Sequence, residues 1–406
     1  MSHSALLSQF DSLLLQSRQL WQVKAFDCDK LPWEENFPNL AALVWSLDDD
    51  ILDELDRVQA ELLNCLLPAL NKDLVLLSES WSLELLNIKA PLCAGSRVRE
   101  MEFQDIAHFS AGIKGRKWAQ ITAFTQELPA DKCEVLEWCA GKGHLGRLIS
   151  KSQGREVVSL EWQQALCDAG EKFAQQWQLP QTFVCADAFD NQQSELKVEQ
   201  QAVALHACGD LHVRLLYLAA KAGTRHIAIS PCCYHLIQAK EYQAMSKVGL
   251  QSELRLSRHD LQLPLQQSTI AKGKQQELRH REIAWRLGFD SLQREVRGGS
   301  CYLPIPSLKQ SQLNGEFSTF CYWAAEQKSV DLPENLNFKR FLELGVERQR
   351  LTRRIDLVAH MFRGVFEHWL LLDRVCYLEE QGYEVTLEQF CNNEITPRNL
   401  LIKAKK

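Results

Sequence analysis

The sequence of 406 residues predicts an α/β protein with an open, mainly parallel sheet, an N-terminal helical region and a largely helical insertion after the fifth strand. Three observations lead to this fold class. An apolar, strand-like run ends in a glycine turn around Gly141, and a helical pattern follows it. Four more strand-like runs follow, with helical patterns between them. Acidic or polar residues recur where these runs end, and this is the sheet edge at which open α/β sheets bind ligands.

The first strand and its turn are the most informative stretch, and residues 133–146 read C-E-V-L-E-W-C-A-G-K-G-H-L-G. A strand, a glycine turn and a helix together present backbone N–H groups to a nucleotide-like ligand. Glycine lets the ligand approach the backbone closely, because it has no Cβ in the ligand's space. The spacing is neither the G-x-G-x-x-G of dinucleotide sites nor a P-loop. An acid at the strand end, Glu137, repels phosphate but suits a cationic ligand such as S-adenosylmethionine. The alternative is a plain tight connection.

The following strands are expected over residues 155–160, 182–185, 202–205 and 226–229, with helices over 163–177 and 211–222. Glu161 ends the second strand about twenty residues after the turn, where nucleotide folds of this kind place a ribose-binding acid. Asp187 follows the third strand and is placed to accept from an adenine amino group.

The remaining chain divides by its patterns into helical and strand-like parts. Leucine and tryptophan stripes predict N-terminal helices near residues 6–14 and 51–62, and composition changes at residues 94–96. Further helical pieces are expected over residues 239–248, 276–287 and 335–380. Residues 383–387 and 400–404 are expected to return to the sheet as an antiparallel pair. The predicted domains are an N-terminal helical domain (1–100), a core (101–235), an insertion that caps the site (236–380) and the final strands (381–406).

Three ordered motifs also resemble a known family. L-E-W-C-A-G-K-G-H-L-G, A-L-H-A-C-G-D-L and S-P-C-C-Y-H resemble the S-adenosylmethionine-dependent methyltransferase domain of methyltransferase-like protein 25 and of the glutathione S-transferase C-terminal domain-containing protein. The eukaryotic tRNA 2′-O-methyltransferases are more distantly similar. The resemblance covers roughly residues 100–235 and resumes at the P-R-N of residues 397–399. It implies a Rossmann-like class I methyltransferase sheet.

The resemblance also implies roles for single residues. Glu137, Cys139, Gly141 and Gly143 would line the methionine side of S-adenosylmethionine, and His206 would lie near the reacting methyl group. Glu161 would hold the ribose and Asp187 the adenine. The family usually has Asp and Gly where this chain has Glu137 and Cys139, so a thiol stands where the backbone normally meets the cofactor.

Catalysis and substrate binding are expected at the ends of the fourth and fifth strands. A hydroxyl acceptor needs a base, and the candidates there are His206, Asp210 and His235. The residues expected to contact substrate, with Tyr234 able to stack on an aromatic group, are Lys114, Arg116, Lys117, Cys232, Cys233 and Tyr234.

The cysteines indicate a reduced protein without a resident metal. Fourteen cysteines are scattered through predicted strands and helices, as free buried cysteines are, which argues for a cytoplasmic location. A zinc or iron–sulfur site is the alternative, because five potential ligands would share one sheet edge: Cys139, Cys208, Cys232, Cys233 and His206. No C-x-x-C pair occurs, so the prediction is no metal. No apolar run is long enough for a membrane span, so no membrane partner is expected.

Charge favours RNA as the methyl acceptor. Residues 1–100 hold an excess of eight acids, whereas the rest of the chain carries a net charge of +2 with basic runs at 114–117, 272–297 and 339–354. A basic surface beside a cofactor site is what an RNA substrate needs. The alternatives are a protein or small-molecule methyltransferase, or a non-catalytic module that binds the cofactor.

Overall fold

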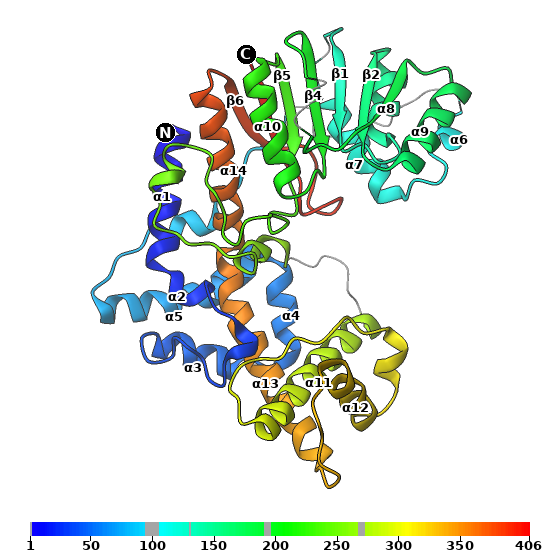
Figure 1. Cartoon of the computed structure of the whole chain (residues 1–406). Helices are drawn as coiled ribbons and strands as arrows, with labels where there is room; N and C mark the ends of the chain where they lie inside the picture. The colour runs from blue at the N-terminus through cyan, green and yellow to red at the C-terminus, as the bar shows by residue number, and fades with distance from the viewer. Residues whose placement is uncertain (1, 94–104, 130, 191–195, 267–272) are drawn as a thin grey trace. The chain divides into compact units, whose positions relative to one another are not determined.

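The computed structural model describes residues 2–93, 105–129, 131–190, 196–266 and 273–406. It contains a seven-stranded sheet in the order β3-β2-β1-β4-β5-β7-β6 (Figure 1). The strands have these bounds: β1 Glu134–Trp138, β2 Val157–Glu161, β3 Gln181–Cys185, β4 Gln200–Leu205, β5 His226–Ser230, β6 Glu384–Gln389 and β7 Leu400–Lys405.

Strands β1 to β5 are mutually parallel, and β7 runs antiparallel to them. The last two strands form an antiparallel pair with each other, as the sequence predicted, so β6 runs in the same direction as the five parallel strands. Val135 of β1 lies beside Val157 of β2, and Leu136 lies beside Ala202 of β4. β7 runs antiparallel to β5, with Ile229 beside Ile402, and also pairs antiparallel with β6. The last strand in the sequence therefore lies inside the sheet, between β5 and β6.

Helices cover both faces of the sheet because alternate residues of each strand point to opposite faces. Leu136, Ile227 and Ile402 pack in a core with apolar residues of α10 (Asp210–Ala222) and α14 (Arg363–Glu380). Val135, Val203 and Leu401 pack on the other face with α7 (Gly115–Gln126) and α8 (His144–Gln153). This part of the chain contains two more helices, α6 Ile106–Phe109 and α9 Gln164–Gln176.

The chain forms two compact units that differ from the predicted domains. Unit 1 consists of residues 1–12, 88–265 and 364–406, and unit 2 of residues 13–87 and 266–363. Residues 236–265 and 364–380, predicted to belong to the insertion, therefore lie in the unit that contains the sheet. The predicted boundary at residues 94–96 lies outside the described residues. The capping role of the insertion stays a prediction.

Unit 2 is built from helices. They are α2 Arg18–Trp21, α3 Pro38–Ser46, α4 Asp49–Arg57, α5 Gln59–Leu77, α11 Lys274–Arg297, α12 Phe317–Lys328 and α13 Phe338–Ala359, and α1 His3–Gln16 runs into this unit from unit 1. Arg354 of α13 is 1% exposed and ties α13 to α3 and α4. Its guanidinium donates to Val44 O at 2.9 Å, Leu47 O at 2.8 Å and Asp49 Oδ1 at 2.8 Å. These bonds satisfy a charge that is costly to bury unpaired.

Two predicted helices differ in the structure. Residues 239–248 contain no helix, and a single 3-10 turn follows at Gly249–Gln251. The helical pattern of residues 51–62 is split, because Val58 has an extended conformation between α4 and α5. Across the described part of the chain, no helix combines the length and apolar character that a membrane crossing needs.

Candidate functional site

The turn between β1 and α8 holds three residues in the left-handed region. The φ angles of Cys139, Gly141 and Gly143 are +56°, +60° and +65°. A Cβ on Gly143 would overlap the side chains of Gln181 and Phe183, so this position needs glycine. A Cβ on Gly141 would meet no atom within 4 Å, so the backbone there borders open space. The turn therefore offers an accessible backbone at the carboxyl edge of the sheet.

Glu161 joins this turn to the end of β2. Its Oε2 accepts from Gly141 N at 2.9 Å, and its Oε1 accepts from Gln163 N at 3.1 Å. The side chain is 5% exposed. The predicted ribose-binding acid and the glycine turn thus lie together, as their spacing in the sequence indicated.

Glu137 lies beneath the turn rather than open to it. Glu137 is 4% exposed, and its carboxylate accepts from Ser159 Oγ at 2.7 Å. Burial raises the pKa of Glu137 to about 7, although Ser159 and the backbone N–H groups of Gly146 and Leu145 favour the charged form. Glu137 therefore holds the N-terminus of α8 against β1 and β2, which is a positioning role.

Cys139 and Asp187 lie at the same edge. Burial first, then the charges of Glu161, Cys208 and Asp187, raise the pKa of Cys139 to about 12, so its thiol stays protonated. Asp187 is exposed after β3, and its Oδ1 accepts from Phe189 N at 2.9 Å. Glu161 and Asp187, the acids predicted to bind ribose and adenine, therefore both raise the pKa of the Cys139 thiol in the turn.

His206 follows β4 and is held by residues from distant parts of the chain. Its Nε2 lies 2.8 Å from Gln120 Oε1. Burial, and then the charges of Lys117 and Arg398, lower the pKa of His206 to about 4, so the imidazole is neutral near pH 7. Because an amide oxygen only accepts, Nε2 carries the proton and Nδ1 keeps its lone pair.

Gln120 and Arg398 are site residues that the sequence analysis missed. Gln120 lies one helical turn after Lys117 on α7, so both residues are on the same face of the helix. The predicted basic segment therefore indicated which helix face borders the site, but not that Gln120 is part of it. Arg398 belongs to the P-R-N element of residues 397–399, and its Nη2 donates to Leu265 O at 2.6 Å. Lys114, the N-cap of α7, and Arg116 on its first turn are exposed, and partial burial lowers the pKa of Lys117.

Asp210 has a structural task that occupies its carboxylate. Its Oδ2 accepts from Gln238 N at 2.7 Å, and its backbone N donates to Leu236 O at 3.1 Å. Gly209, at φ +57°, lies so close to Leu236 O that no Cβ fits. Asp210 therefore docks the turn after β4 onto the turn after β5, which is a positioning role; its role as a base stays a prediction.

The docked turns bring three cysteines together. Sγ of Cys208 lies 3.3 Å from Sγ of Cys232, which lies 3.6 Å from Sγ of Cys233. The hydrogen bond from Cys232, ahead of the one from Cys233, lowers the pKa of Cys208. All three are free thiols.

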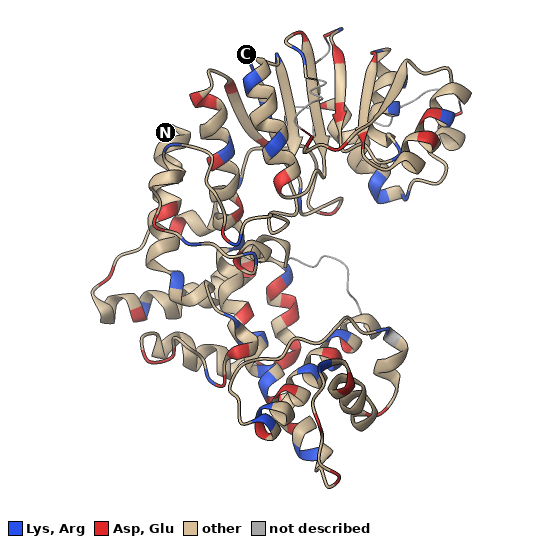
Figure 2. Cartoon of the chain, in the orientation of Figure 1, with Lys and Arg blue, Asp and Glu red and all other residues tan. Residues whose placement is uncertain are grey.

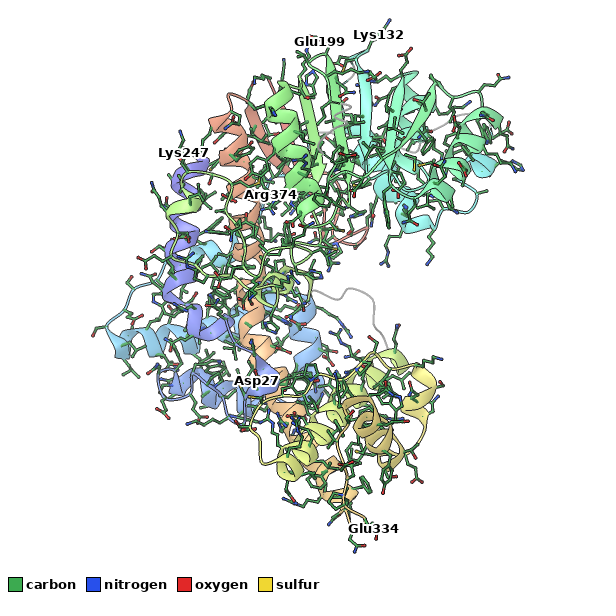
Figure 3. The ribbon with its side chains drawn as sticks, in the orientation of Figure 1. Asp27, Lys132, Glu199, Lys247, Glu334 and Arg374 are labelled. Carbon is green, nitrogen blue, oxygen red and sulfur yellow. The ribbon has the colours of Figure 1, made fainter. Side chains whose placement is uncertain are left out.

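Tyr234 does not fit the predicted contact with substrate, because it is 1% exposed. Its hydroxyl donates to Glu367 Oε1 at 3.2 Å, and its ring meets His212 edge to face. Arg374 (Figure 3) donates to Nε2 of His212 at 2.8 Å. His212 Nδ1 therefore carries the proton and donates to Ala207 O at 3.1 Å, which fixes the turn after β4.

His235 keeps its place among the candidates at this edge. Its Nδ1 is buried and has no hydrogen-bond partner among the described residues. Buried polar atoms are rarely left unpaired in folded proteins, so this nitrogen marks a position where a ligand or water would be favoured.

The segment that contains this site is similar to known proteins. Residues 106–240 match a protein-family model whose description is "methyltransferase domain". These residues form a methyltransferase domain. The match contains the glycine turn, Glu161, His206 and the three clustered cysteines.

Solved structures with similarity to this chain include three methyltransferases. A TehB-like SAM-dependent methyltransferase from Corynebacterium glutamicum is 16% identical over 27% of this chain and 60% of that chain, with a TM-score of 0.22. Geranyl diphosphate methyltransferase in complex with SAM is 13% identical over 31% and 58%, with a TM-score of 0.25. An rRNA methylase from Streptococcus thermophilus is 10% identical over 30% and 73%, with a TM-score of 0.24. The first two are matched over less than two thirds of their length.

Unit 2 contains a cavity of its own, outside the methyltransferase domain. Its lining includes Asp53, Asp56, Arg353, His280 and His360. These groups pair with one another: His360 Nδ1 lies 2.6 Å from Asp56 Oδ1, and Arg353 lies 3.1 Å from Asp53. Such mutual pairing satisfies the charges within the fold, so the cavity is a weaker candidate than the sheet edge.

Proposed function

We propose that this protein is an S-adenosylmethionine-dependent methyltransferase and that its methyl acceptor is RNA. The observation that carries the first part is the contact of Glu161 with Gly141 N, inside a segment that matches a methyltransferase domain. An acid at the second strand beside an open glycine turn suits a ribose and a cationic amino acid.

The residues present fit this cofactor. The open space at Gly141 and the buried carboxylate of Glu161 form a cradle at the strand ends. S-adenosylmethionine, when bound, supplies an activated methyl group. We expect Glu161 to bind the ribose, Asp187 the adenine and the backbone of residues 139–143 the methionine part.

The acceptor side is proposed at the ends of β4 and β5. His206 donates through Nε2 to Gln120, so its Nδ1 is free to accept a hydrogen bond from a hydroxyl or amino acceptor. A fixed imidazole can orient that acceptor, and positioning is the main requirement of methyl transfer.

RNA is the acceptor that the exposed charges next to this site favour. Lys114 caps the N-terminus of α7, Arg116 and Lys117 lie on its first turn, and the charge of Lys117 acts on His206. The basic runs of unit 2 are less available. Figure 2 shows Lys and Arg mixed with Asp and Glu along α11 and α13, where Arg286 pairs with Glu282 and Arg340 with Glu295. We therefore propose that α7, and not α11 or α13, contacts RNA phosphates.

The cofactor assignment is tested by equilibrium binding of S-adenosylmethionine to the full chain. Glu161→Gln should weaken binding at least tenfold, because glutamine keeps the shape of the side chain but removes the charged hydrogen-bond acceptor. Asp168→Asn, an exposed acid on α9, is the matched control and should bind as the wild type does. Equal affinity of all three proteins would overturn the assignment.

The acceptor is tested by transfer of radiolabelled methyl groups into extract from cells that lack this protein. Label that nuclease removes supports RNA, and label that only protease removes overturns it in favour of a protein acceptor. Replacing Lys114, Arg116 and Lys117 by Gln should lower RNA methylation and its salt dependence. Lys172→Gln, an exposed lysine on α9, should leave both unchanged.

A further inference from the structure

The three clustered thiols come from two turns that are 24 residues apart in sequence. Cys208 follows β4, and Cys232 and Cys233 follow β5, so the parallel strands deliver them to the same sheet edge. Their Sγ atoms all lie within 4.8 Å of one another. We infer that Cys208, Cys232 and Cys233 form a zinc site with three protein ligands and an open fourth position.

The spacing of the sulfur atoms suits one metal ion. Zinc–thiolate bonds of about 2.3 Å in a tetrahedron place neighbouring sulfurs about 3.8 Å apart. The observed separations of 3.3 Å and 3.6 Å need only a small outward movement to reach that geometry. The sulfurs of the vicinal pair Cys232 and Cys233 are therefore already close enough to bind the same ion.

The backbone around the thiols holds them in place. The Gly209 Cα lies against Leu236 O, where only glycine fits, and Asp210 bonds both Leu236 O and Gln238 N. On the other side, Arg374 and His212 fix Ala207, the neighbour of Cys208. A set of ligands fixed by such surrounding bonds loses little entropy when it binds an ion.

The nature and number of the ligands point to zinc. Thiolates are soft ligands that favour zinc over magnesium or calcium. Iron–sulfur clusters use four ligands, whereas the one group of three or more potential metal ligands found within 4.8 Å of one another among the described residues has three members. Zinc sites with three protein ligands keep a position for water or substrate. The open position would admit an oxygen, nitrogen or sulfur donor.

The test uses the full chain purified under reducing conditions without chelator. Elemental analysis should find one zinc per chain. Apoprotein should rebind added Zn²⁺ stoichiometrically, and Co²⁺ should produce a thiolate-to-cobalt absorption band. Cys208→Ser and Cys232→Ser should lose the metal. Cys185→Ser, at the end of β3 on the same edge, is the matched control and should retain it.

A second measurement needs no variant and so does not depend on whether a variant folds. Zn²⁺ should protect Cys208, Cys232 and Cys233 of the wild type from alkylation, as measured by mass spectrometry, and a chelator should remove this protection. Unchanged alkylation with added Zn²⁺ would overturn the site. A purified protein with an iron–sulfur chromophore, or equal loss of zinc in Cys185→Ser, would also overturn it. The outcome of these tests does not depend on methyl transfer, because metal content and alkylation are measured without cofactor or substrate.

Discussion

Cys139 is a residue whose side chain opposes its backbone conformation. At φ +56° the Cβ of a non-glycine residue lies close to its carbonyl oxygen, which costs about 1 kcal/mol. We expect Cys139→Gly to raise the free energy of unfolding by up to about 1 kcal/mol, since part of the gain is offset by the flexibility of glycine in the unfolded chain. Urea unfolding measures the change. Cys185→Gly, in the extended strand β3, should be destabilising, and a loss of stability in Cys139→Gly would contradict the prediction.

Glu137 makes stability depend on pH. Its ordinary pKa of 4.5 rises to about 7 in the fold, so the folded protein binds more protons than the unfolded chain between these values. The free energy of unfolding should therefore fall as pH rises through this window. Arg147 of α8 and Lys117 of α7 act on Glu137 and reduce the effect without reversing it.

Glu137→Gln should flatten this dependence. Chemical unfolding at a series of pH values from about 4.5 to about 7.5 measures the slope for the variant and the wild type. Glu134→Gln, at the opposite end of β1, is the control and should keep the wild-type slope. A variant with an unchanged slope would show that Glu137 does not titrate as described.

At the scale of elements, Gly209 controls how two turns pack. It combines a positive φ with contact against Leu236 O, so alanine there would add backbone strain and force the turns apart. Gly209→Ala should lower the free energy of unfolding by about 3 kcal/mol. Gly154→Ala is the matched control: its φ is +65°, but no atom lies within 4 Å of the added Cβ. It should cost about 1 kcal/mol. Equal losses in thermal unfolding would show that packing against Leu236 is unimportant.

The elements that the sequence predicted well are those with a strong local pattern. Each parallel strand is an apolar run that ends in a turn signal, and the final pair was recognised in the same way. The segment 239–248 was predicted wrongly as a helix because its backbone is satisfied by a distant side chain. Asp373 of α14 accepts from Met245 N at 2.8 Å and from Ser246 N at 2.9 Å. Local periodicity carries no information about such a partner.

The same distinction applies to the site. The spacing of Gly141 and Glu161 is set by one strand–turn–helix–strand unit, from β1 to β2, so their proximity could be predicted. Gln120 reaches His206 from α7, and Arg398 acts on it from the loop between β6 and β7. Their positions depend on how α7 and β7 pack on the sheet, which no short motif encodes. The boundaries of unit 1 and unit 2 could not be predicted either, because each unit combines segments that are far apart in the sequence.

At the scale of the whole molecule, the sheet depends on β7. This strand pairs with β5 on one side and β6 on the other, so its removal separates β6 from the sheet. Deleting residues 390–406 should abolish cooperative unfolding of unit 1, measured by circular dichroism. Ile402→Ala, at a fully buried position, should cost about 2–5 kcal/mol, and the exposed Lys405→Ala should be nearly neutral. A soluble truncation that binds cofactor would contradict this prediction.

The position of β7 also has a consequence for synthesis. β5 ends at Ser230 and its partner begins at Leu400, so the ribosome must add the intervening residues while one edge of β5 has no partner. At usual rates of elongation this takes on the order of ten seconds. An unpaired apolar edge is a template for pairing with other chains. The nascent protein is therefore most exposed to aggregation during a period set by translation speed, and slower elongation through residues 231–399 should lengthen that period.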